Sequence, residues 1–137
     1  MPRKSRPRLA QDALDFRRRL LRWFRAHGRD LPWRRTRDPY HIAVSEFMLQ
    51  QTQVSRVEGF YGRFLERFPS VHHLAAAPAS AVREAWEGLG YYRRAHNLQR
   101  LAQEVAGRED GFPEDPAALR ELPGVGPSTA GAIARLA

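Results

Sequence analysis

Apolar residues recur at intervals of three and four along most of the chain, which is the spacing of one face of an α-helix. The first such stripe runs through residues 12–27 and consists of Leu14, Leu20, Leu21 and Phe24. Arginines occupy positions between them, and Gly28 follows as a stop signal. No stretch alternates between apolar and polar residues for long enough to predict a β-strand. The pattern therefore predicts an all-α protein.

Turn signals divide the rest of the chain into further helices. Asp38–Pro39 combines an N-cap with a first-turn proline, and it starts a helix that runs to about Gln51. Asp115–Pro116 repeats this signal before a short helix that ends near Leu122. Between them, helices are expected at about 53–67, 70–76, 79–87 and 91–107. The chain ends inside a last helix, whose buried face is expected to hold Ala130, Ile133, Ala134 and Ala137.

The turn before this last helix, LPGVG at 122–126, is suited to holding an anion. Glycine permits positive φ and lets a partner approach the main chain closely. Freed amides from Gly124 to Gly126 would then lie at the positive end of a helix dipole, as in a helix-hairpin-helix motif bound to a DNA phosphate. Val125 is expected to pack into the core. Tight packing of the second helix is expected from the small residues Ser128, Ala130 and Gly131.

Charge is spread unevenly over the 137 residues, whose net charge is +8. Residues 1–37 hold 13 basic and 3 acidic side chains, so a polyanion would meet this segment first. A disordered basic arm with a solvated helix face explains the same charge equally well. The chain contains no cysteine, which excludes disulfides and cysteine-bound metal clusters built from this chain alone. No apolar run predicts a membrane span or a secretory signal, so we expect an intracellular, cytoplasmic and nucleoid-associated protein.

Two further segments are specific enough to indicate a family. LPWRRTRDPYHIAVSEFMLQQTQV at 31–54 and GLGYYRRAHNL at 88–98, together with the hairpin, resemble the MutY-type adenine DNA glycosylases, which are relatives of endonuclease III. The likeness extends over residues 12–137. It implies the all-α helix-hairpin-helix glycosylase fold, as a six-helix barrel domain over 29–137 with the hairpin at 116–137. The remainder would be a basic arm at 1–11 and, at 12–28, the first helix of an incomplete cluster-bearing domain.

The resemblance implies an enzyme that flips adenine out of duplex DNA when it is mispaired with 8-oxoguanine or guanine, and then hydrolyses its N-glycosidic bond. Glu46 would be the catalytic acid that protonates adenine at N7, helped by apolar neighbours that raise its pKa. From periodicity alone, the favoured interpretation of Glu46 is a surface glutamate on an amphipathic helix, and the match of the surrounding SEFMLQQTQV reverses this. At the hairpin, Ser128 replaces the lysine of the strand-cleaving relatives, which predicts a monofunctional glycosylase that uses water.

The resemblance also implies roles in DNA and adenine binding for individual residues. Trp33, Arg34 and Arg29 would line the adenine pocket, and Gln51 and Tyr91 would enter the duplex beside the lesion. Tyr92 is expected in the core, while Arg93 and Arg94 either contact phosphate or are simply exposed. The DNA phosphate would be bound at the hairpin by Gly124, Val125, Gly126, Ser128 and Thr129.

The chain also lacks features that the resemblance implies. The related enzymes carry an essential aspartate beyond the hairpin, four cysteines that hold a [4Fe-4S] cluster, and usually a further C-terminal domain. We therefore expect an N-terminal portion that binds double-stranded DNA as a monomer but does not turn over. The resemblance also suggests a monovalent cation at the hairpin. The alternatives are a non-enzymatic helix-hairpin-helix DNA-binding module and, disfavoured by Ser128, a bifunctional lyase.

Overall fold

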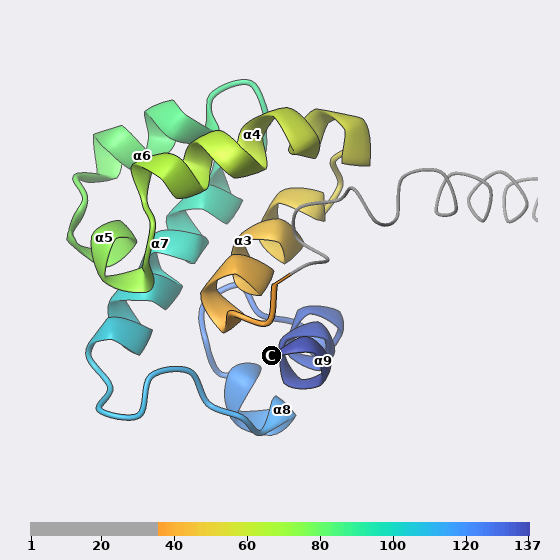
Figure 1. Ribbon diagram of the computed structural model, residues 1–137, viewed down its shortest axis with the longest axis vertical. Helices are drawn as coiled ribbons and strands as arrows, with labels where there is room; N and C mark the ends of the chain where they lie inside the picture. The colour runs from red at the N-terminus through yellow and green to blue at the C-terminus, as the bar shows by residue number, and fades with distance from the viewer. Residues whose placement is uncertain (1–35) are drawn as a thin grey trace, which may run out of the picture. The chain divides into compact units, whose positions relative to one another are not determined.

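The computed structural model describes residues 36–137, which form one compact unit with helices and no strands (Figure 1). The helices are α3 (Pro39–Leu49), α4 (Val54–Arg67), α5 (Val71–Ala76), α6 (Ala79–Trp86), α7 (Tyr92–Ala106), α8 (Pro116–Leu119) and α9 (Pro127–Leu136). This confirms the predicted all-α class, and the helices begin and end within a few residues of the predicted positions. The expected arm at 1–11 and the helix at 12–28 lie outside the described residues. The boundary at residue 29 stays a prediction.

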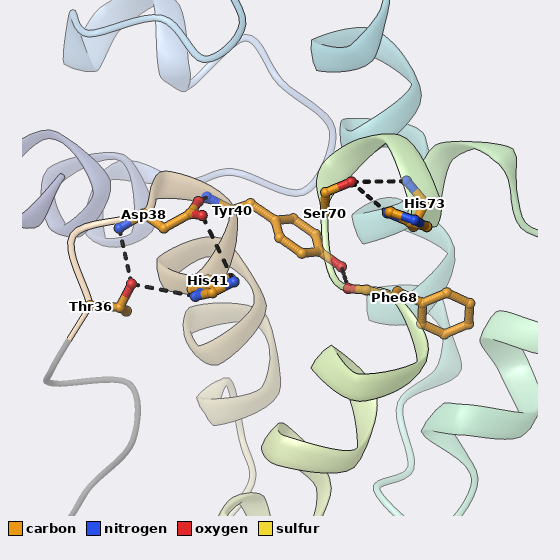
Figure 2. A network of polar contacts seen from close by, with 7 residues as sticks. All are labelled: Thr36, Asp38, Tyr40, His41, Phe68, Ser70 and His73. Atoms are coloured by element: carbon orange, nitrogen blue, oxygen red, sulfur yellow. Dashed lines mark hydrogen bonds and ion pairs between the residues drawn. The ribbon is translucent and has the colours of Figure 1, made fainter.

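The N-cap predicted at Asp38 forms, whereas Asp115 precedes α8 without a side-chain hydrogen bond to it. Ser70 caps α5, although no cap was predicted there. Asp38 Oδ1 accepts a hydrogen bond of 2.8 Å from the Tyr40 amide at the start of α3, and Ser70 Oγ accepts one of 3.3 Å from the His73 amide in α5 (Figure 2). Figure 2 also shows the Tyr40 hydroxyl donating to the Phe68 carbonyl at 2.6 Å, which ties the start of α3 to the end of α4. These bonds satisfy backbone groups that helix ends leave open.

Helix α3 lies at the centre of this unit, in contact with α4, α7 and α9 (Figure 1). It is buried around most of its circumference, which is the pattern of a core helix and not of a surface helix. Its buried residues are Tyr40, Ile42, Ala43, Val44, Ser45, Phe47 and Met48. Large buried side chains of the other helices complete the core, among them Phe64 of α4 and Trp86 of α6, whose rings meet edge to face at 5.9 Å.

Helix α9 packs on α3 through a narrower face than the sequence suggested. Ala130, Ala132 and Ile133 are buried, whereas Ala134 is half-buried and Ala137 is exposed. Of the small residues expected to allow tight packing, only Ala130 does so. Ser128 is exposed, and a Cβ added to Gly131 would meet no atom within 4 Å. Within residues 36–137 no helix is long and apolar enough to cross a membrane.

Candidate active site and nucleic-acid interface

Glu46 is a carboxylate on an otherwise apolar core helix. It lies in the second half of α3 between the buried residues Ser45 and Phe47, and its own side chain is half-buried. Within residues 36–137 the carboxylate accepts no hydrogen bond and forms no ion pair. Burial raises the pKa of the Glu46 carboxyl above its ordinary value, and the positive charge of Arg135 on α9 acts in the opposite direction. The raised pKa that the sequence predicted is confirmed, and it favours a group that can hold and donate a proton.

The turn between α8 and α9 is held against this helix by Gly124. Its φ of 72° lies in the left-handed region, and a Cβ at this position would lie 2.9 Å from both Phe47 Cε2 and Asn97 Cβ. The neighbouring Val125 side chain is buried, as predicted. Its amide, however, donates to the Leu122 carbonyl at 3.2 Å, so the expectation that this amide is free to bind phosphate is wrong.

The start of α9 offers amides that the protein itself does not use. Gly126 is the N-cap without a capping side chain, and the first helical hydrogen bond runs from the Ala130 amide to the Gly126 carbonyl at 3.0 Å. The amides of Ser128 and Thr129 therefore have no acceptor within the helix. A Cβ added to Gly126 would meet nothing within 4 Å, so packing does not require glycine there. Unpaired amides at a helix N-terminus are the kind of group that binds anions in proteins, and phosphate binding here stays a prediction.

A side-chain hydrogen bond connects the hairpin to the end of α3. Gln50 Nε2 donates to Thr129 Oγ1 at 3.2 Å, and the Thr129 side chain is buried while Ser128 beside it is exposed. The hairpin is thus joined to α3 by this bond and by the contact between Gly124 and Phe47. No local pattern indicates this pair, because its two members are 79 residues apart.

Gln51 and Tyr91 lie on one surface although they are distant in sequence. Both side chains are exposed, Tyr91 by 59%, and both line a cavity of about 570 Å³. The backbones share a feature as well, since φ is 60° at Gln51 and 53° at Tyr91. Both residues precede a helix, α4 and α7 respectively. Left-handed backbone at residues other than glycine is uncommon and occurs often at functional sites.

Arg94 was predicted either to contact phosphate or to be exposed, and both expectations are wrong. The residue is only 9% exposed. Its Nη1 donates to the carbonyls of Phe47 at 2.8 Å and Met48 at 3.1 Å, and also to that of Gln50. Its Nη2 donates to Thr52 Oγ1 at 2.9 Å and to the Gly90 carbonyl at 3.4 Å. A signal for burial was present, because Arg94 continues the apolar stripe of Leu98, Leu101 and Val105 along α7.

Of the other residues singled out from the sequence, some lie within the described part of the chain and some lie outside it. Tyr92 is 39% exposed with the Arg83 guanidinium over its ring, so its expected place in the core is wrong. Arg93 is exposed, and its contact with phosphate stays a prediction. The expected adenine-pocket residues Trp33, Arg34 and Arg29 lie outside the described residues.

The chain does not fit the implied iron–sulfur cluster. It contains no cysteine, and in the described part no three His, Cys, Asp or Glu side chains are grouped so that they could hold a metal ion. The monovalent cation at the hairpin stays a prediction.

Comparison with known proteins agrees with this geometry. Residues 44–129 match the family described as HhH-GPD superfamily base excision DNA repair protein. The chain is 43% identical over 122 residues to the adenine DNA glycosylase of Buchnera aphidicola subsp. Baizongia pistaciae (strain Bp), and 47% identical over 117 residues to that of Mycolicibacterium smegmatis. These alignments cover 88% and 84% of this chain, which spans only 35% and 40% of the two relatives. A solved structure of a thermostable thymine-DNA glycosylase is similar with a TM-score of 0.74 at 30% identity, covering 96% of this chain and 61% of that one.

Proposed function

Since the chain belongs to the HhH-GPD superfamily of base excision DNA repair proteins, we propose that it binds duplex DNA at a mispaired adenine and releases that base. The opposing base is expected to be 8-oxoguanine or guanine. One observation carries the proposal: Glu46, on the helix that supports the hairpin, is a half-buried carboxyl with a raised pKa and with no hydrogen bond or ion pair to the described residues. We further propose that the protein acts on DNA inside the cell as a monomer.

DNA binding is assigned to the hairpin and to the surface that holds Gln51 and Tyr91. The amides of Ser128 and Thr129 would bind one backbone phosphate, and the open face of Gly126 would let the strand approach. This contact is independent of sequence. Gln51 and Tyr91 would enter the duplex and fill the space that the extruded adenine leaves.

Glu46 would then act on the extruded base. Its carboxyl donates a proton to adenine N7, and the bond between N9 and the sugar carbon C1′ breaks with its electron pair passing to the base. Water adds to C1′ and loses a proton to the Glu46 carboxylate, which restores the acid and leaves an abasic site. Ser128 has no amine and forms no Schiff base with the sugar, so the strand is not cut by this route. Trp33, Arg34 and Arg29 are proposed to hold the adenine ring.

Adenine release under single-turnover conditions tests the proposal. The 137-residue chain is mixed in excess with duplexes that contain A:8-oxoguanine, A:G or A:T, over incubations long enough to detect slow release. In keeping with the expected loss of turnover, we expect only slow release from the two mispairs and none from A:T. Glu46→Gln should lower this slow release by a further factor of about 100 or more. Glu58→Gln is the matched control, because Glu58 is an exposed glutamate on α4.

A non-enzymatic DNA-binding module is the second candidate, since the free amides at the start of α9 do not depend on Glu46. It predicts duplex binding that is equal for wild type and Glu46→Gln, with no release of adenine from any duplex. Release that is the same in Glu46→Gln and wild type would contradict the role of Glu46.

A further inference from the structure

Two of the described residues other than glycine have left-handed backbone, a conformation that contacts with their surroundings must stabilise. Within residues 36–137, Gln51 and Tyr91 are the non-glycine residues with positive φ. Side chains with a Cβ avoid this conformation, so it persists only where surrounding contacts impose it. Both residues also line the same cavity and are those proposed to enter the duplex.

The Arg94 guanidinium contacts the backbone directly before each of these residues. It donates to the carbonyl of Gln50, which precedes Gln51, and to the carbonyl of Gly90, which precedes Tyr91. The Gly90 carbonyl accepts a second hydrogen bond of 3.0 Å from Trp86 Nε1. One planar group thus joins the α3–α4 turn to the turn before α7.

Burial of the Arg94 guanidinium carries a free-energy cost that an exposed arginine would avoid. Burying a guanidinium is unfavourable unless its donors are satisfied, and burial lowers the pKa of the Arg94 side chain below its ordinary value. Most of its donors find acceptors, although Nε has none within residues 36–137. The guanidinium carbon also lies 5.6 Å from the centre of the Trp86 ring and 5.1 Å from that of the Tyr91 ring. A lysine lacks the fork that reaches several carbonyls at once.

We propose that Arg94 is a positioning residue that fixes the backbone of Gln51 and Tyr91 so that both side chains can enter a duplex beside an extruded base. This rests on the proposed function, because it takes these two side chains to be the ones that enter DNA. Arg94 itself need not touch the DNA.

The first experiment measures duplex distortion. Wild type, Arg94→Met and Arg94→Lys are titrated onto a duplex with 2-aminopurine next to an A:8-oxoguanine mispair, and onto the matched A:T duplex. We expect Arg94→Met to lose at least fivefold of the fluorescence increase at saturation and about tenfold in affinity for the mispair. Affinity for the A:T duplex should stay within twofold, because the hairpin carries it. Arg100→Met, at an exposed position of α7 to which no DNA contact is assigned, is the control and should behave as wild type.

The second experiment tests the backbone without DNA. Urea unfolding is measured for wild type, Gln51→Gly, Arg94→Lys and the double variant. If Arg94 imposes the positive φ, Gln51 is strained in wild type and glycine at this position relieves the strain. The increase in the folding equilibrium constant on Gln51→Gly should then be at least fivefold larger with Arg94 present than in the Arg94→Lys background. Additive effects would overturn the positioning role. Arg94→Lys also keeps the test open if Arg94→Met does not fold.

The two experiments separate the two ideas. Suppose that the unfolding experiment shows coupling between Arg94 and Gln51, but wild type gives no fluorescence change on binding DNA. The proposed function then fails while the positioning role stands. The inference is overturned if folded Arg94→Met or Arg94→Lys gives the same fluorescence change as wild type. It is also overturned if the variant loses affinity equally for both duplexes, because Arg94 then has a merely structural role.

Discussion

Gly124 of the hairpin lies against the ring of Phe47, so closely that a Cβ would come within 2.9 Å of the ring. Phe47 follows Glu46 on α3, and the contact therefore fixes the hairpin turn relative to the proposed catalytic acid. If the turn binds a DNA strand as proposed, the same contact sets the distance between that strand and the Glu46 carboxyl.

The two hairpin glycines should respond differently to alanine. Gly124→Ala places a side chain in left-handed backbone and against Phe47, so we expect a loss of about 2–4 kcal/mol in the free energy of unfolding. Gly126→Ala has open space and extended backbone, so stability should change by less than about 0.5 kcal/mol. DNA affinity should nevertheless fall about tenfold, because the methyl group blocks close approach of the phosphate. Urea unfolding and fluorescence anisotropy measure the two effects, and equal destabilisation by both changes would contradict the assignment.

The stability of the protein should depend on pH through Glu46. Because its pKa is raised in the folded state, the folded protein holds this proton more tightly than the unfolded chain does. The resulting stabilisation is present below the ordinary pKa of 4.5 and is lost as pH rises through the folded pKa. We expect Glu46→Gln to be more stable than wild type at neutral pH and to lack this part of the pH dependence. Thermal unfolding from pH 4 to pH 8 measures it, with Glu58→Gln as the control.

The hydrogen bond between Gln50 and Thr129 should contribute a measurable coupling. Gln50→Leu, Thr129→Val and the double variant form a cycle in which we expect an interaction of about 0.5–1.5 kcal/mol. If the bond also fixes the hairpin, either single change should weaken binding to matched and mispaired duplexes alike. Additive stabilities would show that the bond contributes nothing.

Ser128 provides a test of the reaction type. Its side chain is exposed in the first turn of α9, so Ser128→Lys should fold as wild type does. The new amine should reach the sugar of an abasic site and give a covalent adduct on borohydride treatment, whereas wild type should give none. Arg93→Lys, at an exposed position outside the hairpin, is the control for trapping by any surface lysine. Trapping of wild type would instead support a lyase that uses another amine.

Local signals in the sequence determined the helices and much of the hairpin. The N-cap at Asp38 and the breaks at proline and glycine depend on neighbours within a few residues, so their positions could be predicted. The apolar residues around Glu46 likewise indicated its raised pKa. The family, too, followed from motifs that are contiguous in sequence.

Tertiary structure alone decided the contacts between distant residues. Periodicity along α7 indicates that Arg94 can be buried, but its hydrogen bonds to the carbonyls at the end of α3 depend on which elements pack beside α7. The same holds for the Val125 amide, which the turn itself uses, and for Tyr92, which the packing of α6 and α7 leaves exposed. Sequence pattern shows which residues can be buried together, whereas only the packed chain shows which polar groups meet there.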